Sequence, residues 1–158
     1  MNDVTSRYPT EDVEKPRIVI LISGSGSNML TIADQVLSGS IDADIAGVVC
    51  NEPEAAGVQK ARDRDLDVSV IDHRGFTSRE EFDVALMRTI DDYQPDLVVL
   101  AGFMRILTPD LVRRYEGRML NIHPSLLPKY QGLHTHRRAL EAGDDLHGVT
   151  VHFVTEVL

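Results

Sequence analysis

The chain has 158 residues, 42% of them hydrophobic, so it is long and apolar enough for one compact domain with a buried core. Its 25 acidic and 16 basic side chains give a formal net charge of −9, which argues against a nucleic acid as the main partner. The one cysteine, Cys50, excludes an intrachain disulfide, and the sequence shows neither a membrane-length apolar run nor a secretory signal. We therefore expect a cytoplasmic protein with no membrane partner.

Residues 1–16 are polar and without periodicity, so we expect a flexible N-terminal tail followed by one domain over residues 17–158. The domain opens with a continuous, mostly β-branched run at 18–22, which is typical of a strand buried on both faces. Apolar residues then fall on one helical stripe over 29–37. Further strands are predicted over 45–50, 68–71, 97–101, 118–122 and 149–154. Further helices are predicted over 53–64, 78–93 and 134–141, and a short helix is expected to begin at Thr108.

Strands that alternate with helices predict an α/β fold with a largely parallel sheet. Ligands of such sheets bind at the carboxyl ends of the strands. The candidate site residues are therefore expected in three segments: 23–28 after the first strand, 102–107 after the fourth, and 121–131 at the end of the fifth.

The glycine–serine segment 23–28 links the first strand to the first helix. Its glycines allow close backbone approach, and a helix N-terminus presents N–H groups, so the segment predicts an anion site, favoured for phosphate. Met29 stands where a dinucleotide fingerprint needs its third glycine, and no lysine follows Gly26 as a Walker loop requires. A phosphate monoester is thus favoured over NAD or ATP. The alternative is a plain strand-to-helix turn without a ligand.

Asn121 and His123 are two residues apart at the end of a predicted strand, so their side chains should point to the same side. An amide can stabilise a developing oxyanion, and an imidazole can move protons near neutral pH, which makes the pair usable in acyl transfer. Pro124 and Pro128 would stiffen the loop behind them. The alternative is a histidine that is merely hydrogen-bonded at a strand end.

No metal site is expected, because His134 and His136 point apart on a helix and no cysteine lies near them in the sequence. Cys50 ends a buried strand and is expected to be an inert core thiol. His152 lies in a strand, where we expect it to pack in the core, and His73 has no distinctive context.

Five stretches then carry a family resemblance: LISGSGSN at 21–28, VVLAGFMRIL at 98–107, the run 120–130, GLHTH at 132–136, and the run 147–155. Together they resemble the phosphoribosylglycinamide (glycinamide ribonucleotide) formyltransferases, over residues 17–158 with little need for gaps. The resemblance implies a Rossmann-like, doubly wound, mostly parallel sheet. It also implies transfer of the formyl group of 10-formyltetrahydrofolate to the amine of 5'-phosphoribosylglycinamide in purine biosynthesis. We therefore expect two small-molecule partners, the ribonucleotide and a reduced folate as co-substrate, with no metal, and a monomer or homodimer.

The resemblance assigns roles residue by residue. Asn121 and His123 match the catalytic pair of the family. The loop that holds the substrate phosphate is matched by Gly26, Ser27 and Asn28. The folate site is matched by Arg79, Met104, Arg105, Ile106, Leu107, Asn121, Thr155, Glu156, Val157 and Leu158, of which the last four begin a loop that closes over the folate.

Members of the family continue beyond the point that matches Leu158, and their catalytic aspartate would follow directly. We expect a chain that stops there to lack the C-terminal part of the fold and to have weak or no activity. The aspartate would favour the charged imidazolium, so His123 should be charged less often without it.

Three alternatives are kept. Methionyl-tRNA formyltransferases share the Asn-x-His segment, but their acceptor is a nucleic acid, which the net charge of −9 and the stretch 132–136 oppose. Formyltetrahydrofolate deformylases normally carry an N-terminal regulatory domain, which residues 1–16 cannot form. A non-catalytic folate- or nucleotide-binding module is the third alternative.

Overall fold

A computed structural model of the chain describes residues 14–123, 135–143 and 150–156. These ranges form a six-stranded sheet in the order β3-β2-β1-β4-β5-β6. All pairs from β3 to β5 are parallel, and β6 is antiparallel to β5 at the edge of the sheet. The strands are β1 (Arg17–Ile22), β2 (Asp44–Cys50), β3 (Val68–Val70), β4 (Leu97–Leu100), β5 (Met119–His123) and β6 (Thr150–Phe153). The predicted α/β fold with a mostly parallel sheet is confirmed.

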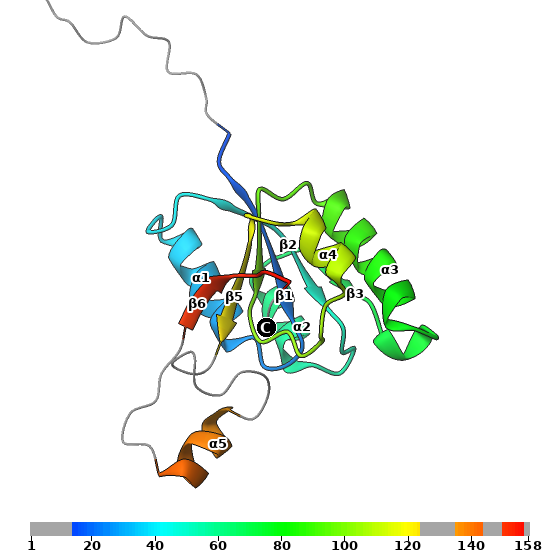
Figure 1. Cartoon of the computed structure of the whole chain (residues 1–158). Helices are drawn as coiled ribbons and strands as arrows, with labels where there is room; N and C mark the ends of the chain where they lie inside the picture. Colours follow the sequence, from blue (N-terminus) through cyan, green and yellow to red (C-terminus); the bar gives the residue numbers. More distant parts are fainter. Residues whose placement is uncertain (1–13, 124–134, 144–149, 157–158) are drawn as a thin grey trace, which may run out of the picture.

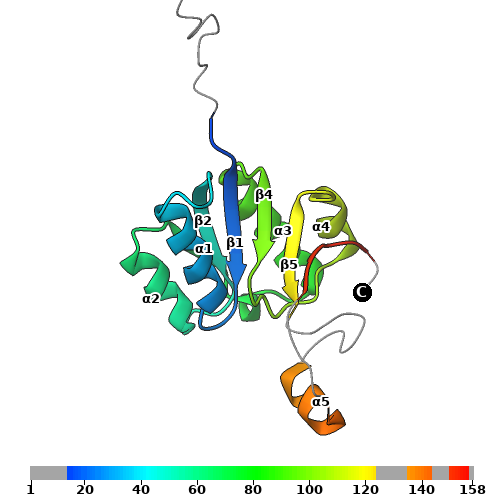
Figure 2. The ribbon, with the colours of Figure 1, turned by 90° about the vertical axis from the view of Figure 1, so that its left-hand side faces the viewer.

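Helices cover both faces of this sheet, as Figures 1 and 2 show, with α1 and α2 on one face and α3 and α4 on the other. Two separate buried clusters correspond to these two layers. The sheet is therefore doubly wound. The helices are α1 (Ser27–Leu37), α2 (Ala56–Asp63), α3 (Arg79–Asp92), α4 (Pro109–Arg114) and α5 (Thr135–Ala142), with a short 3-10 helix η1 (His73–Gly75) before α3.

The continuous apolar run of β1 serves both layers because successive side chains of a strand point to opposite faces. Ile18, Ile20 and Ile22 pack in the cluster that includes residues of α1 and α2. Val19 and Leu21 pack in the cluster that includes residues of α3 and α4. All five side chains are buried, so the prediction of a central strand buried on both faces is confirmed.

Side chains cap the starts of α3 and α4, close to the predicted helix starts at Ser78 and Thr108. The Ser78 hydroxyl accepts a hydrogen bond from the Glu81 N–H at 3.1 Å, and the Glu81 carboxylate accepts from the Thr77 hydroxyl at 2.7 Å. Thr108 caps α4 and Pro109 occupies its first turn, where a missing N–H costs nothing. These caps fix where α3 and α4 begin, next to the segment that follows β4.

The helix α2 begins later than predicted. The sequence indicated a start at Pro53, but residues 52–55 form a turn in which the Ala55 N–H donates to the Glu52 carbonyl at 3.1 Å. The proline therefore belongs to the turn, and the helix begins at Ala56.

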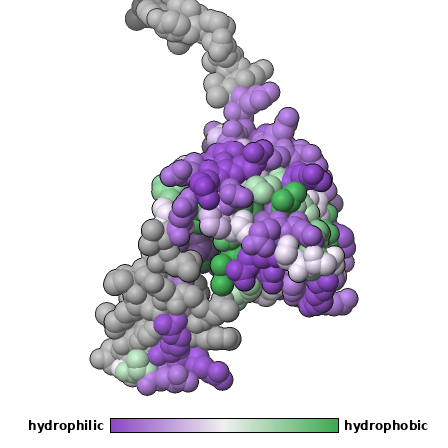
Figure 3. Space-filling view, turned by 45° about the vertical axis from the view of Figure 1, so that its right-hand side comes forward, coloured by the Kyte–Doolittle hydropathy of each residue, from purple (hydrophilic) through white to green (hydrophobic). Residues whose placement is uncertain are grey.

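The surface in Figure 3 is mainly hydrophilic with separate hydrophobic patches. Within the described ranges, none of the helices has the length and apolar character needed to cross a membrane.

Some sequence-based predictions fall outside the described residues. They concern residues 1–13 of the expected tail, the proline-containing loop 124–131, His134, Val157 and Leu158. Residues 14–16 of the expected tail are described and exposed.

Candidate active site

The carboxyl ends of β1, β4 and β5 meet at one edge of the sheet, and the candidate residues gather there. Leu100 at the end of β4 lies opposite Asn121 of β5, which in turn lies opposite His152 of β6. On the other side of β4, the Ser23 N–H just after β1 donates to the Gly102 carbonyl at 3.2 Å. The glycine–serine loop and the polar side chains of β5 therefore flank the end of β4, about 10 Å apart at the usual strand spacing.

A pocket of about 200 Å³ lies over the glycine–serine loop. Residues 23–28 line it together with Ala101, Gly102 and Met104. The structure thus brings the three predicted phosphate residues, Gly26, Ser27 and Asn28, to one pocket. It also brings Met104 of the predicted folate segment to the same pocket.

Gly26 is required by the shape of this loop. Its φ is +72°, and a Cβ atom there would lie 2.8 Å from the Met29 Cε and 3.1 Å from the Gly57 Cα. Gly57 of α2 is equally tight, because a Cβ on it would lie 2.8 Å from the Gly24 carbonyl oxygen. Two glycines therefore let the loop rest directly on α2.

The start of α1 offers backbone N–H groups to the pocket. Among the described residues no side chain caps this helix, whose N-cap is Gly26. The Lys60 ammonium donates to the Ser25 carbonyl at 3.2 Å, which puts a positive charge beside the loop. Open N–H groups, the positive end of the helix dipole and a lysine all favour an anion at this position. Sequence reasoning missed Lys60, because only the packing of α2 against the loop reveals it.

Asn121 is held by the edge strand β6. The Asn121 Nδ2 lies 3.3 Å from the His152 Nε2, and the His152 Nδ1 lies 3.0 Å from the Phe153 carbonyl oxygen. A carbonyl can only accept, so His152 carries its proton on Nδ1 and its Nε2 accepts from the Asn121 amide. The expectation that His152 packs in the core is wrong: the residue is half-buried, and its ring contacts the candidate amide.

His123 lies at the end of β5 and is buried, with its ring centroid 6.3 Å from that of His152. Asn121 and His123 are two residues apart on one strand and both approach His152, so they share a face as predicted. An imidazole and an amide therefore converge at the carboxyl end of β5.

The predicted folate segment 104–107 runs past the end of β4 into α4. Met104 is 62% exposed and Ile106 is 57% exposed, so the segment offers apolar side chains to a ligand. The Arg105 guanidinium lies over the Phe82 ring, 5.4 Å from its centroid. Leu107 is partly buried and packs against the core beneath α3 and α4.

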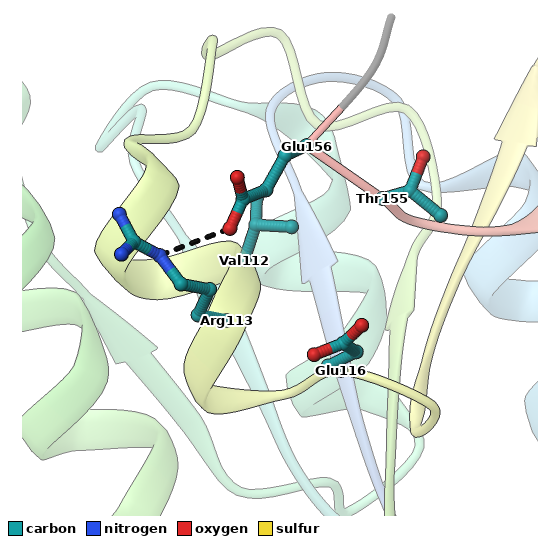
Figure 4. A pocket seen from close by; sticks show the side chains of 5 residues that line it. All are labelled: Val112, Arg113, Glu116, Thr155 and Glu156. Carbon is teal, nitrogen blue, oxygen red and sulfur yellow. Dashed lines mark ion pairs between the residues drawn. The ribbon is translucent and has the colours of Figure 1, made fainter.

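The other predicted folate residues lie elsewhere. Arg79 is exposed at the first position of α3. Thr155 and Glu156 line a second pocket of about 310 Å³ with Val112, Arg113 and Glu116. Figure 4 shows the carboxylate of Glu156 turned toward Arg113, at an Nε–oxygen distance of 2.9 Å. The two pockets share no lining residue, so Thr155 and Glu156 do not line the pocket over the glycine–serine loop.

Cys50 is fully buried at the end of β2. Burial raises the pKa of its thiol, so the neutral form is favoured and the prediction of an inert core cysteine is supported. Among the residues that the structure describes, no group of three or more His, Cys, Asp or Glu side chains could hold a metal ion.

Open α/β sheets bind their ligands where the strand order reverses. Here the order reverses between β1 and β4, and residues from the ends of both strands line the pocket over the glycine–serine loop. The chain is thus an α/β protein of the doubly wound class, with a pocket at the position where such sheets bind ligands. The family model described as formyl transferase matches residues 16–158, and the chain belongs to this family.

Individual relatives are closely similar. The phosphoribosylglycinamide formyltransferase of Escherichia coli (strain K12) is 52% identical over 141 residues, which are 89% of this chain and 66% of the relative. The corresponding Haemophilus influenzae protein is 48% identical over 140 residues, again 66% of its length. The chain therefore spans slightly less than two thirds of these relatives.

Solved structures agree in fold. The phosphoribosylglycinamide formyltransferase of Coxiella burnetii superposes with a TM-score of 0.83 at 48% identity, covering 90% of this chain and 67% of that one. The glycinamide ribonucleotide transformylase 1 of Geobacillus kaustophilus gives a TM-score of 0.87 at 35% identity, covering 92% of this chain and 77% of that one.

Proposed function

We propose that this chain binds 5'-phosphoribosylglycinamide and 10-formyltetrahydrofolate and transfers the formyl group from the folate to the glycinamide amine. The observation that carries the proposal is the placement of Asn121 and His123 at the end of β5, two strands from a glycine loop suited to phosphate. Membership of the formyl transferase family and the names of the relatives support it.

In this proposal the phosphate of the ribonucleotide occupies the loop pocket. Gly26, Ser27 and Asn28 bind it through the N–H groups at the start of α1, and Lys60 adds positive charge beside it. From there the ribose and glycinamide extend past the end of β4 toward Asn121. The nucleophilic amine is then placed beside the amide and the imidazole.

The reduced folate lies along residues 104–107, where the exposed side chains of Met104 and Ile106 cover its apolar faces. Arg105 and Leu107 complete that segment. Arg79 and residues 155–158 contribute further folate contacts in the proposal.

The chemistry needs no metal, because an uncharged amine is itself a competent nucleophile. The amine nitrogen bonds to the formyl carbon, and the carbonyl π pair moves onto oxygen. The amide N–H of Asn121 stabilises that oxygen, which carries the negative charge of the tetrahedral intermediate. His123 takes the proton from the attacking nitrogen. The pair on oxygen then re-forms the carbonyl as the bond from carbon to the folate nitrogen breaks, and His123 delivers a proton to the leaving nitrogen.

The test separates binding from turnover. Calorimetric titration measures the affinity of the chain for phosphoribosylglycinamide and for a non-transferring 10-formyltetrahydrofolate analogue, and a spectroscopic assay follows loss of the formyl donor. We expect binding of both ligands and slow formylation of the ribonucleotide. Binding of both without turnover would identify a binding module instead, and binding of neither would contradict the proposal.

A further inference from the structure

The segment after β4, residues 104–108, is held at both of its ends by buried side chains from other parts of the chain. At its start, the Ser23 hydroxyl accepts a hydrogen bond from the Met104 N–H at 2.8 Å. At its end, the Asp83 carboxylate accepts from the Thr108 N–H at 2.7 Å. Ser23, Asp83 and Thr108 are all buried, with exposed fractions of 9%, 1% and 8%. The exposed side chains between these two ends therefore stand on a backbone that is fixed at two points.

Ser23 also belongs to the glycine–serine loop, and so it connects the two ligand segments. Its N–H donates to the Gly102 carbonyl at 3.2 Å, and its hydroxyl donates to the Asn51 Oδ1 at 2.5 Å. The Asn51 amide in turn lies 3.2 Å from the His73 Nδ1. One buried hydroxyl thus ties the loop after β1 to the segment after β4, and the turn after β2 orients that hydroxyl.

Among the described residues, the Asp83 carboxylate accepts its hydrogen bond from Thr108, where the segment after β4 ends and α4 begins. Asp83 lies on α3 next to Phe82, whose ring contacts the Arg105 guanidinium, so adjacent residues of α3 support both the middle and the end of the segment. A bond from a backbone N–H to a carboxylate is charge-assisted and stronger than one between neutral groups. The other carboxylate oxygen, Oδ1, is buried without a hydrogen-bond partner among the described residues. Within the described part of the chain, the bond from Thr108 is therefore the hydrogen bond that this buried carboxylate accepts.

We infer that Ser23 and Asp83 are positioning residues of the proposed reaction: Ser23 aligns the phosphate loop with the folate segment, and Asp83 aligns the folate segment alone. The inference rests on the proposed function. It predicts an asymmetry, in which loss of Ser23 disturbs the binding of both ligands and loss of Asp83 disturbs only that of the folate.

The positioning itself is measured without any ligand, by NMR amide exchange at Met104 and Thr108. Ser23→Ala should speed exchange at Met104 about fivefold and leave Thr108 unchanged, as expected for the loss of one neutral hydrogen bond. Asp83→Ala should speed exchange at Thr108 about tenfold and leave Met104 unchanged, because a bond to a charged group is lost. Asp83→Asn retains an acceptor oxygen and should retain most of the protection at Thr108.

Two matched variants control for general loosening. Ser69→Ala, in β3, removes a 2.6 Å hydrogen bond between Ser69 and Tyr93. Asp91→Ala removes a carboxylate further along α3 that binds Arg114. Neither control variant should change the amide exchange rate at Met104 or Thr108. Equal acceleration in the controls and in the Ser23 and Asp83 variants would overturn the inference.

Titration of the same variants tests the asymmetry. Ser23→Ala should raise the Kd for the ribonucleotide and for the folate analogue about fivefold each. Asp83→Ala should raise only the Kd for the folate analogue, and Asp83→Asn should largely restore it. If the unmodified chain binds both ligands and Ser23→Ala weakens neither, the inference is wrong while the proposed function stands. If the unmodified chain binds neither, the proposed function fails, and the exchange rates still show whether the two residues hold the segment.

Discussion

Asn121 and His152 lie directly opposite each other on β5 and β6, and the Asn121 amide nitrogen is 3.3 Å from the His152 Nε2. An amide nitrogen carries two hydrogens, so one can bond to His152 while the other donates to a ligand. The edge strand therefore aims the amide that the proposed reaction uses to stabilise the formyl oxygen.

Replacing His152 should misorient that amide without removing it. We expect His152→Ala to slow formyl transfer about fivefold, the effect of losing one hydrogen bond, and to leave the ribonucleotide affinity unchanged. His152→Gln offers a carbonyl acceptor of similar reach and should recover part of the rate. Single-turnover kinetics measure both variants, and a His152→Ala rate equal to that of the unmodified chain would show that Asn121 needs no partner on β6.

Gly26 and Gly39 form a matched pair for testing the phosphate loop. Both have positive φ, +72° and +83°, but a Cβ on Gly26 meets Met29 and Gly57 whereas one on Gly39 meets nothing within 4 Å. Alanine at Gly39 should lower the free energy of unfolding by about 1–2 kcal/mol, because the residue must keep a left-handed conformation. Alanine at Gly26 should cost at least as much, because its Cβ also meets Met29 and the Gly57 backbone.

Only Gly26→Ala should also weaken ribonucleotide binding, and it should do so far more than it weakens folate binding. Calorimetric titration of both alanine variants provides the measurement. Equal losses of affinity for the two ligands would indicate general misfolding rather than a phosphate site.

The contact between α3 and α4 should make stability depend on pH at the acid end. Burial alone raises the pKa of the Asp91 carboxyl, but hydrogen bonds from Arg114 and Tyr115 outweigh it, so the pKa lies below its ordinary value of 3.8. A carboxyl whose pKa is lower in the folded state stabilises the fold above the ordinary value, and this contribution is lost as the pH falls through the folded value.

Urea unfolding of Asp91→Asn against the unmodified chain, from about pH 6 to pH 2, measures this contribution. The variant should be less stable near neutral pH, and the difference should shrink as the pH drops below the ordinary value of 3.8. A difference that stays constant over the whole range would mean that the charge of Asp91 contributes nothing.

At the alkaline end the sign reverses. Burial, and then the hydrogen bond to Asp91, raise the pKa of Tyr115 well above its ordinary value of 10.0. The fold therefore favours the neutral phenol, and stability is lost as the pH rises above that value. Tyr115→Phe should remove this alkaline decline, although it also removes the hydrogen bond.

Much of this fold could be predicted because its central strands are nearly uninterrupted apolar runs. Residues 18–22 of β1 are all apolar and their side chains fill two core layers, so burial on both faces followed from the sequence pattern. The helix starts at Ser78 and Thr108 were equally predictable, because a cap acts within one helical turn. The start of α2 was misplaced since a proline fits both a first helical turn and the β-turn that forms here.

The site was predictable only where its parts are close in sequence. Asn121 and His123 are two apart on one strand, so strand periodicity sufficed to place them together. The partners of Ser23 are 28 and 81 residues away, at Asn51 and Met104, and no local pattern reports such contacts. We expected His152 in the core because the periodicity of a strand does not show its place in the sheet. It could not show that β6 lies at the edge, beside β5.

The central claim is that Asn121 stabilises the formyl oxygen while the glycine–serine loop binds the phosphate of the acceptor. Single-turnover formyl transfer by Asn121→Ala, measured beside its ribonucleotide affinity, tests it most directly. The account predicts a rate lower by about 10²–10³ with the affinity unchanged, because an oxyanion donor acts only in the transition state. A rate equal to that of the unmodified chain, or a loss explained entirely by weaker ribonucleotide binding, would contradict it.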